Sequence, residues 1–440
     1  MATGLSAATY ARRRRQLMRQ VGDDGIVIVP CAPERIRSRD THYPYRPDSD
    51  LWYLTGFAEP HAVLVLVPGR VHAESILFCR ERDPEREGWD GPRVGPEGAV
   101  HALGLDDAYP IDDLDDILPG LLEGRSRVHY HLGRDTEFDL QLIGWLNRTR
   151  SRSHRGAQSP NEFIELGHVL DEMRLFKSAE ELRVMQRAVD ISIEAHQAAM
   201  RAAKPGIAEY ELQAEVERVF RRNDACPAYG SIVGAGANAC VLHYIDNNAK
   251  SAKNDLILID AGAEYRGYAS DITRTFPVSG HFSAEQRALH DLVGAAQRAA
   301  LAQAQPGRPW SAMHDAAIST LTEGLLDLGL LKGTLKQHLK DESHKRFTRH
   351  KTGHWLGLDV HDVGEYRIDG ESRLLEPGMA FTIEPGLYVA PDDRTVPMKW
   401  RGIGIRTEDD VVVTTNGHRI LSEALVRDAG AIEAFMADGL

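Results

Sequence analysis

The chain has 440 residues, of which 42% are hydrophobic and 27% are charged. This composition excludes a disordered or fibrous protein, and the length suffices for two or three domains. Acidic residues outnumber Lys and Arg by 65 to 52, which gives a net charge of -13 at pH 7. We therefore expect no general affinity for nucleic acid or for anionic lipid.

The apolar runs and the cysteines indicate a cellular compartment. The longest plain apolar run, residues 62–67, is far too short to span a membrane, so we expect no membrane association. The 4 cysteines are too few and too scattered for a disulfide scaffold or a cysteine-rich zinc site. These features predict a protein of the reducing cytoplasm.

A run of arginines at residues 12–15 could belong to a targeting signal. The residues that follow, 16–20, do not form the apolar core region of a signal, and no small-residue cleavage site comes after them. We therefore interpret the run as the solvated face of an N-terminal helix.

Residues 1–175 alternate between short strand-like runs and helical segments. Polar residues fill the stretch 148–161, which we expect to be an exposed connector. The alternation predicts a small α/β domain. The expected strands are residues 25–29, 61–67, 74–79 and 127–131, and the expected helices are residues 111–122 and 138–146.

Residues 176–440 repeat one order of elements. A capping-box pattern at Ser178 and Glu181 opens a helix that stops at a Pro-Gly pair, and a second helix and several strands follow. Ser283 and Gln286 open the same order again. The repeat predicts two related α+β halves whose sheets join into one curved antiparallel sheet with helices outside.

Two carboxylates stand out in the first half. Asp260 ends an apolar run, and Asp271 lies in the segment that we expect to be the next strand. If these strands pair about a turn near residues 265–266, the two residues lie directly opposite each other, with β-carbons about 5 Å apart. Ionised carboxylates at that distance need a shared proton or cation. The alternative is that one is a turn residue and the other a surface charge.

The second half offers matching residues. Glu384 ends an apolar strand, Glu408 lies on the returning strand, and His354 is a candidate imidazole beside them. Four carboxylates and one imidazole favour manganese over a zinc site, and their charge suits two divalent ions. Two ions about 3.5–4 Å apart can share a bridging hydroxide that attacks a peptide carbonyl. His243 and His361 flank these strands, although either could be an ordinary core histidine.

Motifs of other enzyme classes are weak or absent. Residues 234–239 match a loose dinucleotide fingerprint, but no helical pattern follows them. The sequence contains neither H-E-x-x-H nor G-x-S-x-G, so a single-zinc peptidase and a serine hydrolase lack support.

The segments around these residues resemble the signatures of one family. They resemble metallopeptidases with the pita-bread fold, and within that group the bacterial Xaa-Pro aminopeptidases, or aminopeptidases P. The resemblance spans nearly the whole chain. It is carried by residues 259–276, 350–364, 383–388 and 401–410, which include Asp-Ile-Thr-Arg-Thr-Phe at 271–276, and by residues 43–46 and 49–57 near the N-terminus.

The resemblance implies a role for each candidate residue. Asp260, Asp271, His354, Glu384 and Glu408 would be the ligands of two divalent ions, with Asp271 and Glu408 contacting both. Glu384 would also accept a proton from the bridging water. His243 and His361 would stabilise the tetrahedral intermediate and help to protonate the leaving proline nitrogen, which otherwise departs poorly. The residues expected to line the same pocket are Arg406, Tyr229, Tyr388 and His350.

The sequence departs from the family pattern in two places. The segment 365–373 is one residue longer, so the arginine expected there could be Arg367 or Arg373. Lys351 and Thr352 replace a more apolar pair beside His350, which changes the rim of the site.

The family resemblance also implies an assembly of several copies. We expect a homo-oligomer, either a tetramer or a dimer, in which a tryptophan from a neighbouring subunit reaches the active site. Trp89 is the candidate for that tryptophan.

The sequence thus predicts an α/β N-terminal domain over 1–175 and a pita-bread catalytic domain over 176–440. The expected activity is manganese-dependent removal of the N-terminal residue from peptides with proline in second position. An Xaa-Pro dipeptidase (prolidase) shares the ligands and the chemistry and is the first alternative. The second alternative is an inactive binding scaffold, which a complete ligand set disfavours.

Overall fold

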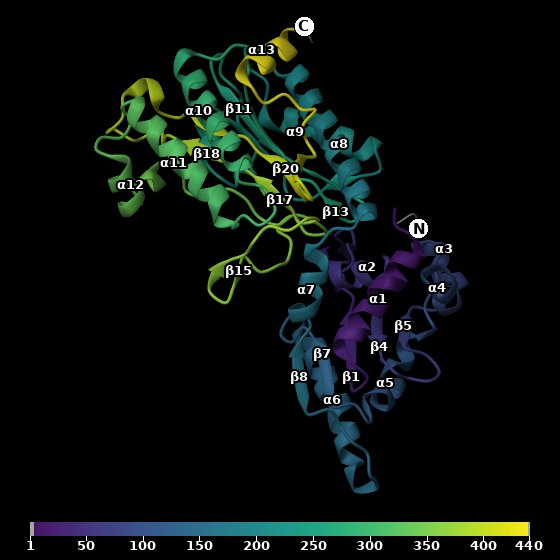
Figure 1. The fold of residues 1–440 in the computed structure, drawn as a ribbon. Helices are drawn as coiled ribbons and strands as arrows, with labels where there is room; N and C mark the ends of the chain where they lie inside the picture. The colour runs from purple at the N-terminus through teal and green to yellow at the C-terminus, as the bar shows by residue number, and fades with distance from the viewer. Residues whose placement is uncertain (1–3, 439–440) are drawn as a thin grey trace. The chain divides into compact units, whose positions relative to one another are not determined.

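A computed structural model describes residues 4–438 (Figure 1). The chain divides into two compact units, one ending at Arg174 and the other beginning at Leu175. Among the described residues, the structure contains no helix long and apolar enough to cross a membrane.

A mixed six-stranded sheet forms the centre of the N-terminal unit, in the order β6-β5-β4-β1-β7-β8. The pairs β1–β4 and β4–β5 are antiparallel, whereas β1–β7, β5–β6 and β7–β8 are parallel. The sheet strands are β1 (Gly25–Pro30), β4 (Val63–Leu66), β5 (Ser75–Cys79), β6 (Asp107–Pro110), β7 (Arg127–Tyr130) and β8 (Glu162–Glu165), and a separate pair is β2 (Ile36–Ser38) with β3 (Thr41–His42). The helices are α1 (Ala7–Val21), α2 (Ser49–Thr55), α3 (Pro84–Asp90), α4 (Gly95–Leu103), α5 (Leu114–Leu122), α6 (Thr136–Ser151) and α7 (Gly167–Leu175).

The four expected strands of this unit are present as β1, β4, β5 and β7. The expected connector is shorter than we predicted at its start, because α6 continues to Ser151, whereas its end agrees with the prediction, since β8 begins at Glu162. The strand β8 escaped notice because it lies at the sheet edge with mostly exposed side chains, so its sequence carries no apolar run.

The arginine run is only partly solvated, which corrects our interpretation. Arg12 and Arg15 are exposed, but Arg13 and Arg14 are buried. Arg13 donates to the carbonyl of Tyr53 at 2.9 Å, near the end of α2. Arg14 donates to carbonyls at the ends of α2 and α4, those of Leu54 (2.9 Å), Leu103 (3.0 Å) and Gly104 (2.5 Å). The two guanidinium groups thus satisfy carbonyls that have no partner within their own helices.

The C-terminal unit repeats the order helix, helix, strands, as we predicted. Capping boxes are present at Ser178 with Glu181 and at Ser283 with Gln286. The first half contains α8 (Ala179–Ala202), α9 (Glu209–Arg222), β9 (Cys226–Pro227), β10 (Ile232–Ala235), β11 (Leu256–Asp260), β12 (Ala263–Tyr265), β13 (Tyr268–Ala269) and β14 (Thr273–Pro277). The second half contains α10 (Ala284–Leu301), α11 (Ser311–Asp327), α12 (Leu335–Asp341), β15 (Arg367–Ile368), β16 (Glu371–Ser372), β17 (Ala380–Ile383), β18 (Gly386–Tyr388), β19 (Gly404–Arg406), β20 (Asp409–Thr414) and β21 (Gly417–Ile420), and the last described helix is α13 (Ala429–Ala437).

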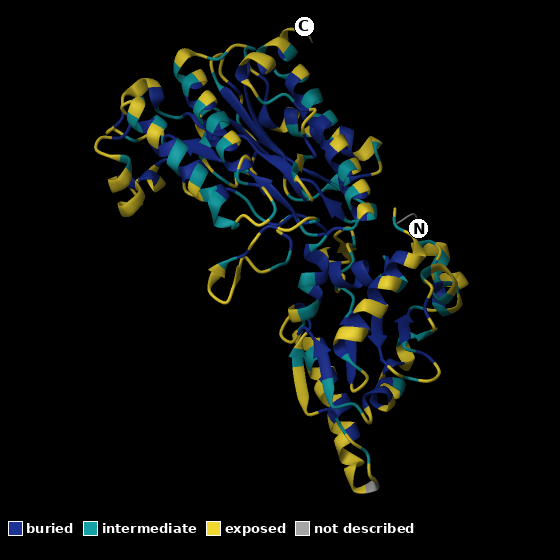
Figure 2. Cartoon of the chain, viewed as in Figure 1, coloured by how far each residue is buried: buried dark blue, intermediate teal, exposed yellow. Residues whose placement is uncertain are grey.

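The central strands of both halves are antiparallel. They form the sheets β10-β11-β14 and β17-β20-β21, and the pair β18-β19 lies between β17 and β20 in sequence. The halves meet where the N–H of Glu408 donates to the carbonyl of Thr273 at 3.1 Å. Figure 2 shows the strands as buried, and the helices α8 to α11 flank them with their outer sides exposed.

The register between β11 and β14 differs from our prediction. Asp260 pairs with Thr273, not with Asp271. The reason is the hairpin β12–β13, which takes up residues 263–269 and displaces the pairing by two positions. Because side chains alternate with a period of two, Asp271 still projects from the same face, as a diagonal neighbour of Asp260.

Candidate metal centre

Four carboxylates reach one place in the C-terminal unit from the ends of strands. Asp260 is the last residue of β11, and Asp271 stands two residues ahead of β14. Glu384 directly follows β17, and Glu408 lies between β19 and β20. These positions lie at or next to the ends of strands, where polar side chains can turn towards one point.

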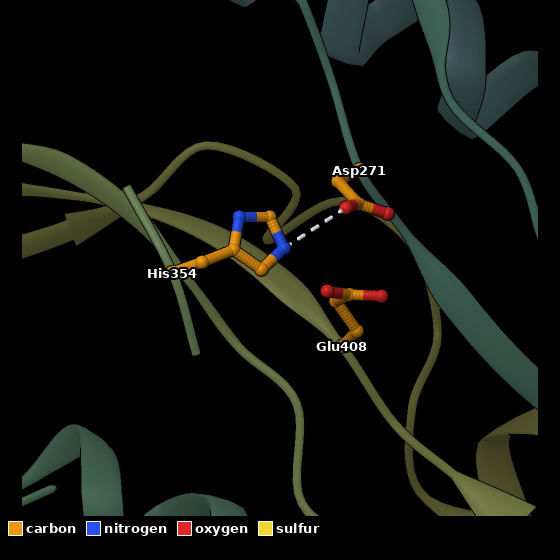
Figure 3. A group of neighbouring side chains, drawn as sticks. All are labelled: Asp271, His354 and Glu408. Carbon is orange, nitrogen blue, oxygen red and sulfur yellow. Dashed lines mark ion pairs between the residues drawn. The ribbon is translucent and has the colours of Figure 1, made fainter. Parts of the chain in front are cut away.

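His354 is oriented by backbone groups around it. Its carbonyl accepts the N–H of Thr382 at 2.9 Å, and its ring Nδ1 lies 3.0 Å from the carbonyl oxygen of Trp355. Donation from Nδ1 leaves Nε2 free to face Asp271, whose Oδ2 is 3.3 Å away. Ligand atoms of Asp271, His354 and Glu408 all lie within 4.8 Å of one another (Figure 3).

Asp260 and Glu384 border this group of three. The hydroxyl of Tyr229 lies 2.6 Å from Oδ1 of Asp260 and 2.5 Å from Oδ1 of Asp271, so both carboxylates reach one hydroxyl. Oε1 of Glu384 lies 3.9 Å from Nε2 of His354. The structure therefore brings together the residues that we predicted as metal ligands.

A second layer of polar groups holds these ligands. The hydroxyl of Thr273 donates to Oε2 of Glu408 at 2.7 Å, and the buried carboxylate of Asp410 accepts the backbone N–H of Asp271 at 3.1 Å. Sequence reasoning missed Asp410. The signal that could have found it is the pair Asp409-Asp410 at the start of an otherwise apolar strand.

The electrostatics of the centre fit a divalent cation. Burial and the charge of Asp260 raise the pKa of Asp271 to about 6, and burial together with Asp271 raises the pKa of Glu408 well above its usual range. Burial disfavours a charge on His354, but its hydrogen bond to Asp271 outweighs this and raises the pKa to about 9. Divalent ions would relieve the repulsion among these carboxylates, and the oxygen-rich donor set suits them.

A cavity of about 830 Å³ opens beside the centre. The rings of His361 and His354 lie 4.3 Å apart, and burial followed by the charge of His354 lowers the pKa of His361. Besides the five candidate ligands, the predicted site residues that line this cavity are His243, His350, His361 and Arg406.

Tyr229 and Tyr388 do not line the cavity, but their hydroxyl groups contact residues that do. The hydroxyl of Tyr388 lies 2.8 Å from Nε2 of His350 and accepts a hydrogen bond from Arg406 at 2.9 Å. Arg406 also donates to Oδ2 of Asp260 at 2.5 Å. The guanidinium thus links Asp260, a candidate ligand, to Tyr388.

The remaining candidates, Arg367, Arg373 and Trp89, lie in different surroundings. Arg367 lines the cavity, whereas Arg373 is buried elsewhere, with its guanidinium 5.7 Å from the ring centroid of Phe176. Trp89 lies on α3 in the N-terminal unit and is 86% exposed.

Sequence reasoning also missed part of the cavity wall. Helical periodicity shows which side of a helix is apolar, but not which residues near its start border a cavity. The lining residues at or just before the start of α11 are Trp310, Ser311, Met313 and His314.

Comparisons with known proteins agree on the family. The profile of metallopeptidase family M24 matches residues 183–415, and that of the aminopeptidase P N-terminal domain matches residues 10–130. The chain is 43% identical to the Xaa-Pro aminopeptidase of Escherichia coli (strain K12), over 98% of each chain. It is 40% identical to that of Haemophilus influenzae, over 97% of this chain and 96% of the relative.

Solved structures show the same agreement. The aminopeptidase PepP of Pseudomonas aeruginosa is 55% identical and superposes with a TM-score of 0.98, covering 99% of each chain. Zinc-substituted E. coli aminopeptidase P in complex with product is 42% identical, with a TM-score of 0.96 and 99% coverage of each chain. The chain therefore belongs to metallopeptidase family M24, with an aminopeptidase P N-terminal domain ahead of a pita-bread metallopeptidase domain.

Proposed function

We propose that this protein is an Xaa-Pro aminopeptidase that uses two divalent metal ions, manganese by preference, to hydrolyse the bond before a proline in second position. The observation that carries the proposal is the convergence of Asp271, His354 and Glu408, with Asp260 and Glu384 beside them, on the wall of one cavity. The donor set is rich in carboxylate oxygen, which favours manganese over zinc.

The five converging residues would hold the metal ions. Bound divalent ions supply two things to a peptide hydrolase: water of lowered pKa and polarisation of the scissile carbonyl. Although burial opposes ionisation of Glu384, the neighbouring His350 and His354 lower its pKa. Glu384 is therefore a carboxylate at neutral pH and can accept a proton.

Two histidines would complete the proton transfers. His361 is neutral at neutral pH because its pKa is lowered, so one ring N–H can donate to the developing oxyanion. His243 lines the same cavity and would help to deliver a proton to the proline nitrogen. The buried Arg406 would fix Asp260 and Tyr388 relative to each other, because it donates a hydrogen bond to both.

The proposal extends to assembly and location. A homo-oligomer, tetramer or dimer, is supported by the exposed Trp89, a side chain that a neighbouring subunit's site could receive. A cytoplasmic location is supported by the free state of Cys31, Cys79, Cys226 and Cys240.

Product analysis tests the activity. Purified protein reconstituted with manganese is offered Ala-Pro-Ala and Ala-Pro in parallel, and the products are identified by mass spectrometry beside a chelator-treated control. We expect release of Ala and Pro-Ala from the tripeptide only when metal is present. Cleavage of Ala-Pro alone would reassign the protein as a dipeptidase, and no metal-dependent cleavage of either peptide would refute the proposal.

A further inference from the structure

Lys351 is a cation on the cavity wall that the metal centre does not use. Lys351 lines the cavity and its side chain is exposed. Among the residues that the structure describes, no carboxylate lies within ion-pair distance of its Nζ. An ammonium on a cavity wall that has no ion-pair partner can bind an anionic group of a ligand.

The backbone at Lys351 is fixed on both sides. Its carbonyl oxygen lies 2.8 Å from Nδ1 of His350, which itself lies 3.3 Å from Oε2 of Glu384. The next carbonyl, that of Thr352, accepts the N–H of Glu384 at 2.8 Å, and its hydroxyl lies 2.8 Å from Nδ1 of His314. The ammonium therefore extends from a backbone segment that is hydrogen-bonded, through Thr352, to the candidate metal ligand Glu384.

The other charges near the mouth of the cavity offset one another. Arg367 and Glu371 lie on the hairpin β15–β16 and carry opposite charges. The guanidinium of Arg367 is also engaged, since it donates to the carbonyl of Gly370 at 3.0 and 2.6 Å. His314 is neutral, because burial lowers its pKa to about 4. Glu342, which feels the charge of Lys351, is itself paired with Lys345 at 2.5 Å, so the ammonium of Lys351 keeps no ion-pair partner of its own.

We propose that Lys351 binds a peptide carboxylate located beyond the proline, so that the enzyme favours substrates with an acidic group there. An aminopeptidase accepts one residue before the scissile bond, so the part of the peptide that reaches the exposed mouth of the cavity lies after it. The carboxylate can belong to an acidic third residue or to the C-terminus of a tripeptide. This inference rests on the proposed Xaa-Pro aminopeptidase activity.

The test compares matched peptides that differ in one charge. Values of kcat/KM are measured for Ala-Pro-Glu-amide and Ala-Pro-Gln-amide, and for Ala-Pro-Ala as free acid and as amide. The proteins are the wild type, Lys351→Met and Lys351→Glu. Lys340→Glu, an exposed position on α12 outside the cavity lining, makes the same charge change as a control.

In the wild type we expect the acidic member of at least one pair to be preferred about threefold, chiefly through KM, as suits a solvent-exposed ion pair. The preference should vanish in Lys351→Met, reverse in Lys351→Glu and persist in Lys340→Glu. A preference in the Glu/Gln pair identifies the side chain as the partner, and one in the acid/amide pair identifies the C-terminus. Equal ratios in all four proteins would overturn the inference, while cleavage of the uncharged peptides would leave the aminopeptidase activity standing.

Discussion

Glu408 bears the least favourable charge of the metal centre. It is 2% exposed, and burial together with Asp271 and Glu384 raises its pKa well above the usual range. Without a cation, its ionised form is therefore destabilising, whereas with a cation that charge is required for binding. Glu408→Gln should separate these two effects, since the amide keeps the shape and can still accept from Thr273.

We expect metal-free Glu408→Gln to be at least as stable as the metal-free wild type. The variant should lose the rise in thermal midpoint that manganese gives the wild type, and its kcat/KM should fall about a hundredfold or more. Thermal melts with and without chelator and metal analysis by mass spectrometry measure this. Glu323→Gln, at an exposed position on α11, is the control. A variant that is less stable without metal yet retains the manganese effect would contradict this account.

Single residues differ in how far the sequence reveals them. Asp260 and Glu384 could be found because each stands at the end of an apolar run. Burial of a charged carboxylate costs free energy, so a carboxylate in such a place indicates a function. Arg13 and Arg14 could not, because their partners are backbone carbonyls, which leave no trace in residue identity. The sequence of an arginine run does not indicate which of its side chains are buried.

At the scale of elements, one side chain links the two halves of the pita-bread domain. Arg274 lies in β14, is fully buried and donates to the carbonyl of Glu408 at 2.6 Å. It also donates to the carboxylate of Asp409 at 2.7 Å and to the carbonyls of Leu425 and Val426. The strand of the first half thus fixes the backbone that presents a ligand of the second.

Arg274→Met should therefore weaken metal binding as well as folding. Loss of a buried, multiply bonded cation is expected to lower the free energy of unfolding by about 3–5 kcal/mol. Arg427→Met is the matched control, because Arg427 binds the same Asp409 at 3.1 Å and, among the residues that the structure describes, forms neither a hydrogen bond nor an ion pair with Glu408.

Urea unfolding and manganese titration by calorimetry give the two readouts. Both variants should be less stable, but only Arg274→Met should bind manganese more weakly, by about tenfold or more. Arg274→Lys should recover part of the affinity, since it keeps the charge. Equal manganese affinities in Arg274→Met and Arg427→Met would mean that Arg274 serves stability alone.

The pairing of elements was less predictable than their order. The repeated helix, Pro-Gly and helix were visible because caps and breakers are local signals. The offset that pairs Asp260 with Thr273 depends on the hairpin β12–β13. Apart from Gly267, the sequence of this hairpin contains no clear turn signal. Register is a matter of long-range pairing, so the sequence predicted the shared face but not the partner.

The molecule as a whole combines two kinds of buried titratable group with opposite effects on acid stability. Carboxylates such as Asp271, whose pKa is raised to about 6, bind protons more readily in the native state, which favours folding as the pH falls. Buried histidines do the reverse. Burial lowers the pKa of both His196 and His290 to about 4, well below the unfolded value of about 6.5.

His290 permits the histidine contribution to be measured by itself. Between pH 6.5 and 4 the unfolded chain binds a proton at this position that the native chain does not, so stability falls as the pH falls through this window. The loss is at most about 1.4 kcal/mol per pH unit for one histidine, and none is expected above pH 6.5. His290→Gln cannot titrate, so its free energy of unfolding should depend less steeply on pH than that of the wild type.

The comparison uses the slope of stability against pH, because the substitution also changes packing beside Phe282, whose ring lies 4.9 Å from that of His290. Urea unfolding at half-unit intervals from pH 7 to 4 gives the slopes of both proteins. His281→Gln, at an exposed position nearby, should leave the slope of the wild type unchanged. Parallel curves for His290→Gln and the wild type would mean that His290 is protonated in the folded protein and that burial does not hold it neutral.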